Sequence, residues 1–126
     1  MDIFIIYESY IIYCKSVKKI FLVIRMNDRI EIAREFAKAI NDEHIIRIIL
    51  FGSVAREENT EDSDIDILVV SNYAKLIEPK IREEVFKVVL DKKEFISAHV
   101  FSEEKLNKIS GFSLMKNIEE EGIVLG

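Results

Sequence analysis

The sequence predicts a single α+β domain built on a small mixed sheet of about three core strands, with helices mainly on one face. Residues 45–51 and 64–71 form nearly continuous apolar runs of strand length, and residues 94–101 alternate between two faces. The segments between them repeat apolar residues with a helical period. At 126 residues, the chain is long enough for one core but not for two.

The first half predicts a helix, a strand, a short helix and a second strand. The first helix covers residues 28–41, with Asn27 and Asp28 as its cap. Its apolar stripe consists of Ile30, Ala33, Phe36, Ala37 and Ile40, and its solvent-facing side carries Arg29, Glu31, Arg34, Glu35 and Lys38. The strand 45–51 follows, then a short helix or turn over 53–58, an acidic loop over 57–63 and the strand 64–71.

The second half predicts a helix, a strand and two further helices. Pro79 suits the first position of the helix, which continues to about Asp91. After the strand 94–101, Ser102 is the expected cap of a short helix. Phe112, Met115 and Ile118 mark a last helix that stops at Gly122. With the helices mainly on one face, the other face of the sheet is expected to stay partly open.

The candidate site is a group of residues at the junction of the two predicted buried strands. The first strand runs into Gly52-Ser53, and the second begins, ten residues later, with Asp64-Ile65-Asp66. Alternate side chains of a strand share a face, so the two carboxylates point the same way and repel each other unless a cation lies between them. Oxygen ligands favour Mg²⁺ or Mn²⁺, which usually arrive with substrate phosphates. Backbone N–H groups at the Gly-Ser turn can bind a phosphate, so the joint pattern indicates nucleotidyl transfer.

The same residues resemble the signature of the minimal nucleotidyltransferases, a branch of the DNA polymerase β-like superfamily. The resemblance rests on the runs 51–56 and 63–69 and extends through 100–104 and 116–122, so that it covers roughly residues 27–126. It implies that Asp64 and Asp66 hold Mg²⁺ and carry catalysis. It also implies that Gly52 and Ser53 hold the triphosphate of ATP. Arg56 can reach a phosphate, or it can form an ion pair with an acid of the loop, namely Glu57, Glu58, Glu61 or Asp62.

The sequence departs from the family pattern at two positions. Relatives often carry a third carboxylate on the next core strand, where this chain has Ser97. A hydroxyl is a poorer metal ligand than a carboxylate, so two-metal catalysis is in question. His99 shares the face of Ser97 and is either a base or ligand there or a histidine lining a half-buried strand. Glu57 stands where relatives tend to have glycine.

The resemblance implies a function in a pair of proteins. The leading interpretation is an enzyme that transfers a nucleoside monophosphate, AMP from ATP, to a hydroxyl of a protein partner. The implied partner is a helical protein of the HEPN type, the toxin of a toxin–antitoxin pair in which this chain is the antitoxin. The alternative is a catalytically weak nucleotide-binding module that neutralises its partner by binding. The sequence leaves open whether the chain forms homo- or hetero-oligomers.

Composition limits the partners and the compartment. The net charge of −5 argues against a nucleic-acid partner, which would require a basic surface. A single cysteine allows no intrachain disulfide and fits a cytoplasmic setting. Residues 1–25 are an apolar N-terminal extension, and we interpret Met26 as the natural start of a domain spanning 26–126. Glu8 and Lys15 interrupt the extension, so it lacks the ~20 apolar residues of a membrane helix.

Overall fold

The computed structural model describes residues 3–7, 10–14, 17–56 and 63–126, with the side chains of those from residue 28 onward except Leu114. Six strands and five helices follow one another within these ranges. In chain order they are β1 (Ile3–Tyr7), β2 (Tyr10–Cys14), α1 (Val17–Ile40), β3 (Arg47–Phe51), α2 (Gly52–Ala55), β4 (Ile65–Val70), α3 (Ala74–Lys92), β5 (Ile96–Phe101), α4 (Glu103–Ile109), α5 (Ser113–Glu121) and β6 (Ile123–Val124).

The central sheet has four strands in the order β5-β4-β3-β6. β3 pairs antiparallel with β4 and with β6, whereas β4 and β5 run parallel. The predicted α+β class with a small mixed sheet is therefore confirmed. The fourth strand, β6, has only two residues, and two residues show no period in a sequence.

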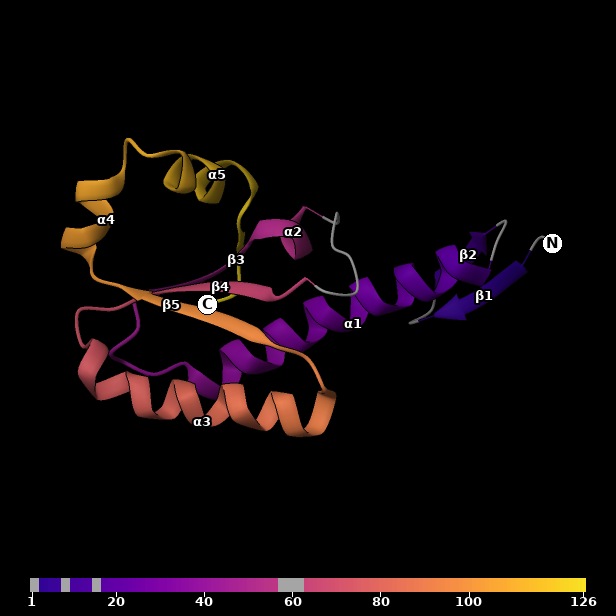
Figure 1. Ribbon diagram of the computed structural model, residues 1–126, viewed down its shortest axis with the longest axis horizontal. Helices are drawn as coiled ribbons and strands as arrows, with labels where there is room; N and C mark the ends of the chain where they lie inside the picture. Colours follow the sequence, from indigo (N-terminus) through magenta and orange to yellow (C-terminus); the bar gives the residue numbers. More distant parts are fainter. Residues whose placement is uncertain (1–2, 8–9, 15–16, 57–62) are drawn as a thin grey trace.

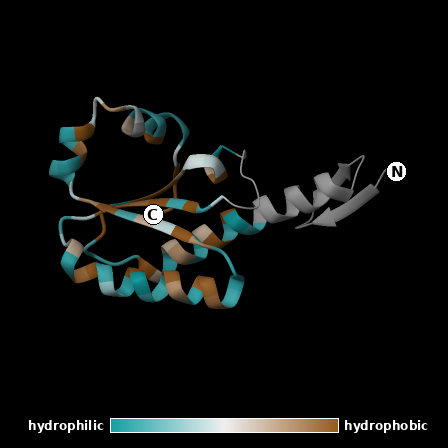
Figure 2. Ribbon diagram, viewed as in Figure 1, coloured by the Kyte–Doolittle hydropathy of each residue, from teal (hydrophilic) through white to brown (hydrophobic). Residues whose placement is uncertain are grey.

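The larger core lies between the sheet and the helices α1 and α3, which cover one face (Figure 1). Ile65, Ile67 and Val69 of β4 point into it and are fully buried. Alternate residues of a strand point to opposite faces, so Asp66, Leu68 and Val70 belong to the other face. Figure 2 shows hydrophobic residues concentrated along the strands, as expected for a sheet packed on both sides.

The other face is closed at one end by α4 and α5 (Figure 1). Met115 and Ile118 of α5 pack on Ile49 and Leu68 of the sheet and form a second, smaller core. Ser102 caps α4 as predicted, because its hydroxyl accepts a hydrogen bond from the N–H of Lys105 at 3.1 Å. The face that carries Asp66 is thus open only over the beginnings of β4 and β5.

The first helix differs from its prediction. α1 begins at Val17, so Asn27 and Asp28 lie inside the helix and are not its cap. No proline or glycine interrupts residues 17–27, and the helix continues upstream for that reason. Arg29 does not face solvent: its side chain is 1% exposed, and its Nε lies 3.3 Å from Oε2 of Glu94, just before β5. This buried ion pair ties α1 to the sheet.

The third helix also begins earlier than predicted. α3 starts at Ala74, which places Pro79 in its second turn and not at its first position. The hydroxyl of Ser71 accepts a hydrogen bond from the N–H of Tyr73, the N-cap residue, at 3.0 Å. Proline at this position removes one helical hydrogen bond, and the helix continues past it. The helix ends at Lys92, and its C-cap residue, Lys93, adopts a left-handed conformation with φ 55°.

The N-terminal segment forms a hairpin of β1 and β2, and α1 runs without a break through Met26. The boundary at residue 26 and the start at Met26 therefore stay predictions. None of the helices in the described ranges is long and apolar enough to cross a membrane.

Candidate nucleotide and metal site

The turn after β3 brings the backbone against a carboxylate. Gly52 adopts φ +75°, a conformation that favours glycine. A Cβ on Gly52 would lie in hard contact with Oδ2 of Asp66 and 3.2 Å from its Cγ. Phe51, at the N-cap of α2, offers no side-chain acceptor to the N–H groups that follow. The Gly-Ser turn and the acid of the next strand thus form one compact structure, as their spacing predicted.

The two carboxylates flank the start of β4. Asp66 is half-buried and stands in register with Phe51 of β3 and Ser97 of β5, while Asp64 is exposed and precedes the strand. Burial raises the pKa of Asp66, and the charge of Asp64 raises it further, whereas His99 and Arg56 lower it. The raised pKa shows a desolvated carboxylate next to a second one, an arrangement that a divalent cation stabilises.

Two residues of β5, Ser97 and His99, lie beside the acids at the start of β4. The Oγ of Ser97 and the Nε2 of His99 are 3.2 Å apart, within hydrogen-bond distance. The imidazole stands between the rings of Phe51 and Phe101, with centroids 6.0 and 6.3 Å away. The structure therefore brings the predicted third-carboxylate position next to Asp66, where the hydroxyl is engaged by the histidine.

Arg56 pairs with a residue that the sequence did not indicate. Its Nη1 lies 3.3 Å from Oε2 of Glu121 at the end of α5. The two residues are 65 positions apart, so no local pattern could have predicted the contact. The loop acids predicted as partners, Glu57 among them, fall in residues 57–62, outside the described residues. Arg56 still lowers the pKa of Asp66, so its charge acts on the site.

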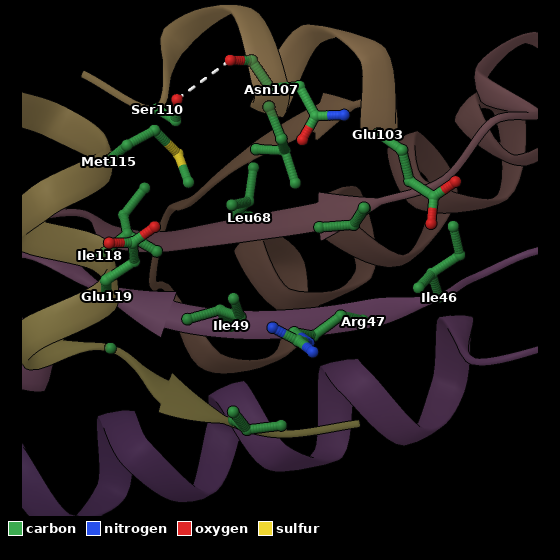
Figure 3. Close-up of a pocket in the computed structure, with 14 residues that line it drawn as sticks. Ile46, Arg47, Ile49, Leu68, Glu103, Asn107, Ser110, Met115, Ile118 and Glu119 are labelled. Atoms are coloured by element: carbon green, nitrogen blue, oxygen red, sulfur yellow. Dashed lines mark hydrogen bonds between the residues drawn. The ribbon is translucent and has the colours of Figure 1, made fainter. Parts of the chain in front are cut away.

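A cavity of about 440 Å³ opens on the same face of the sheet, between the strands and α4–α5 (Figure 3). Its lining includes Leu68, which follows Asp66 along this face, and the charged residues Arg47 and Glu119. None of the predicted site residues lines it. The predicted site is instead the open end of the face, beyond α5.

The side chains present fit a metal that arrives with its substrate. Among the residues described, no group of three His, Cys, Asp or Glu side chains is placed to hold an ion. Asp64 and Asp66 would supply two oxygen ligands, and phosphate oxygens and water would complete the shell of Mg²⁺ or Mn²⁺.

Comparison with known proteins assigns the chain to a class. A mixed sheet that presents a Gly-Ser turn against paired acids is the arrangement expected of a nucleotidyl-transferring domain. The family model described as "Nucleotidyltransferase domain" matches residues 30–125. The chain belongs to this nucleotidyltransferase domain family, and the resemblance found in the sequence is confirmed.

Individual relatives agree with this assignment. "Putative protein adenylyltransferase MJ0604" of Methanocaldococcus jannaschii is 40% identical over 95 residues, which cover 73% of this chain and 92% of the relative. "Putative protein adenylyltransferase MJ1379" of the same organism is 45% identical over 58 residues, covering 38% of this chain and 58% of the relative. A solved structure, "a putative nucleotidyltransferase from Sulfolobus solfataricus", aligns with a TM-score of 0.53 at 19% identity over 87% of each chain, and shows the shared fold.

Proposed function

We propose that this chain is a Mg²⁺-dependent protein adenylyltransferase that transfers AMP from ATP to a hydroxyl of a protein partner. Membership of the nucleotidyltransferase domain family supports the reaction type. The name of the relative with 92% of its length aligned supports a protein as the acceptor. The cytoplasm, which supplies ATP and Mg²⁺, is the setting that this proposal requires.

The observation that carries the proposal is the contact between Gly52 and Asp66. The left-handed turn leaves no room for a side chain at Gly52, so that the backbone of the turn lies against the carboxylate of Asp66. A triphosphate at the turn would place its oxygens within reach of a cation held by Asp64 and Asp66. The Gly52 turn and the acids of β4 would therefore bind the phosphates and the cation of a metal–nucleotide complex together.

The transfer itself requires mainly positioning and charge stabilisation. The acceptor hydroxyl oxygen forms a bond to the α-phosphorus of ATP, and the bond from that phosphorus to the bridging oxygen of the β-phosphate breaks. Pyrophosphate leaves with the electron pair, and the hydroxyl proton passes to solvent or to His99. Bound Mg²⁺ would stabilise the charge on the phosphates. Asp64 and Asp66 would hold the ion, and Arg56 would supply a positive charge to the phosphates.

The partner we propose is the helical HEPN-type protein that the resemblance implies, with a tyrosine hydroxyl as the modified group. In this pairing the chain acts as antitoxin, because adenylylation would inactivate the partner. The proposal predicts that the two proteins are encoded side by side and bind each other.

A second candidate is a nucleotide-binding module that neutralises its partner by docking alone. One observation favours it: Ser97 stands opposite Asp66 where a third carboxylate is expected, and its hydroxyl lies against His99. With only two acids, metal affinity and turnover would be low.

One experiment separates the two candidates. The chain is incubated with ATP labelled at the α-phosphate, Mg²⁺ and the protein encoded next to it. Asp64→Asn/Asp66→Asn and a matched variant at a remote exposed acid, Asp91→Asn, are treated alike. The enzyme predicts label on the partner with the wild type and Asp91→Asn but not with the double variant. Absence of label in all samples, with neutralisation of the partner retained by the double variant, would establish the binding module.

A further inference from the structure

The outer edge of β5 is free in the described part of the chain, since β5 pairs only with β4 there. The carbonyls of Phe95 and Phe101 accept from the N–H groups of Ile65 and Ser71, both at 2.9 Å. In a parallel ladder, successive residues turn their backbone groups to opposite sides, so that residues 95, 97, 99 and 101 face β4 and the alternate residues face away. The N–H and C=O groups of Ala98 and of its neighbours at positions 96 and 100 therefore point outward, ready to pair with another strand.

An apolar hollow of about 500 Å³ adjoins this edge on the side of α3. Its lining includes Phe86 of α3, Phe95 and Ala98. The two phenylalanines are 62% and 64% exposed, and Leu90 nearby on α3 is 63% exposed. Natural edge strands usually carry charges, prolines or bulges that prevent pairing. β5, with the sequence ISAHVF, has no acid, lysine, arginine or proline, so its edge is suited to binding a strand.

Two cationic side chains, Arg82 and Lys93, belong to the segments beside the hollow, although the chain as a whole carries −5. Glu94, the acid that follows Lys93 in the sequence, is paired with Arg29. Arg82 lines the hollow, and Lys93 lies three residues before β5. Within the described ranges neither has a carboxylate at ion-pair distance. Charge complementarity thus favours an incoming segment with carboxylates near its ends.

The outer edge of β5 lies next to the candidate site, because β5 pairs directly with β4, which carries Asp66. Ser97 and His99 of β5 lie on the face of Asp66, whereas Ala98 faces the hollow. A strand added to β5 would lie two spacings from β4, about 10 Å. Its alternate side chains would point toward the acids and into the hollow. A tyrosine of the added strand that points toward the acids would be long enough to extend over the small side chain of Ser97.

We propose that the β5 edge binds an extended segment of the protein acceptor by strand addition, with its hydroxyl residue on the Asp66 face, its apolar residues in the α3 hollow and carboxylates at its ends. This inference rests on the proposed function and names how that site selects its substrate. Main-chain hydrogen bonds give affinity, and the two alternating sets of side chains give specificity.

Binding is tested with a blocked synthetic peptide and ¹⁵N-labelled protein. The peptide alternates valine with threonine, carries one central tyrosine and ends in glutamates. Its control is N-methylated at every residue between the glutamates, so that neither of its edges can pair with a strand. We expect the outward amides of Ile96, Ala98 and Val100 to shift with the first peptide and not with the second. Equal shifts with both peptides, or none at these amides at millimolar peptide, would overturn the proposal.

Two variants test the edge in the whole protein. Ala98→Pro removes an outward N–H without removing a bond to β4, and Ala98→Ser keeps that N–H as its control. Phe86→Glu places a charge in the hollow, and Phe112→Glu does the same at an equally exposed phenylalanine elsewhere. We expect label transfer to the neighbour-encoded protein to fall at least tenfold in the first variant of each pair, with the melting temperature and ATP affinity retained.

The outcomes separate this inference from the proposed function. Label transfer that survives Ala98→Pro and Phe86→Glu would overturn strand addition while the enzyme stands. Absence of transfer by the wild type, with amide shifts from the peptide retained, would reject the enzyme and keep the edge as a binding surface. A wild-type dimer that Ala98→Pro converts to a monomer would show that a second copy occupies the edge, and would overturn the proposal.

Discussion

Substitution of Gly52 by alanine perturbs the candidate site at its tightest point. The left-handed φ of +75° costs an alanine roughly 1–2 kcal/mol. The new Cβ would also collide with the carboxylate of Asp66, which must leave its rotamer at a cost of roughly 1 kcal/mol. We expect a loss of about 2–3 kcal/mol in the free energy of unfolding, which lowers the Tm by roughly 8–12 °C for a chain of this length.

The assay compares thermal unfolding and Mg²⁺-dependent binding of a fluorescent ATP analogue in the wild type and four variants. Gly111→Ala is the matched control, since a Cβ there meets nothing within 4 Å. In an Asp66→Ala background, the cost of Gly52→Ala should shrink by about 1 kcal/mol, because the colliding carboxyl is gone while the φ strain remains. Gly52→Ala matching Gly111→Ala in both stability and binding would refute the close approach.

Three further predictions address the charges of the site. Asp66→Asn should stabilise the metal-free protein at neutral pH, because burial raises the pKa of Asp66 above 3.8 and its charged form opposes folding. The gain in stability should vanish in thermal melts below pH 3.8, where the carboxyl is protonated in both the folded and the unfolded protein. A gain that stays constant with pH would contradict this prediction. Arg56→Gln and Glu121→Gln should each cost less than about 1 kcal/mol in urea titrations, but only Arg56→Gln should weaken ATP binding, by about tenfold. Ser97→Asp should tighten Mn²⁺ binding by about tenfold in calorimetry, and unchanged affinity would place position 97 outside the metal site.

Local patterns predicted the parts of the fold that depend on neighbours in sequence. The apolar run before Gly52 and the acids at the start of β4 fixed two adjacent strands and their shared face, because strand period and burial are both visible in the chain. Ser102 was recognised as a cap for the same reason: its acceptor acts on an N–H three residues away.

Other features depend on contacts between residues that are far apart in the sequence, and local patterns could not predict them. The charge of Arg29 predicts a solvent-exposed side chain, but its ion pair with Glu94, 65 positions later, allows the side chain to be buried. Glu121 meets Arg56 only because α5 packs beside α2. The last helix stops at Gly122 as predicted, but with an ordinary φ of −68°; glycine is required there because a Cβ would collide with the carbonyl oxygen of Ile118 and lie 2.7 Å from Cγ2 of Ile49 of β3. Such contacts depend on tertiary packing and leave no trace in local periodicity.

The central claim is that the Gly52 turn and the acids of β4 form one metal–nucleotide site. Calorimetry with a non-hydrolysable ATP analogue tests it most directly, with and without Mg²⁺. We predict that the wild type binds the analogue only when Mg²⁺ is present, and that Asp64→Asn/Asp66→Asn weakens this binding by about 100-fold without a loss of Tm. Equal affinity of the two proteins, or binding independent of the metal, would contradict the claim.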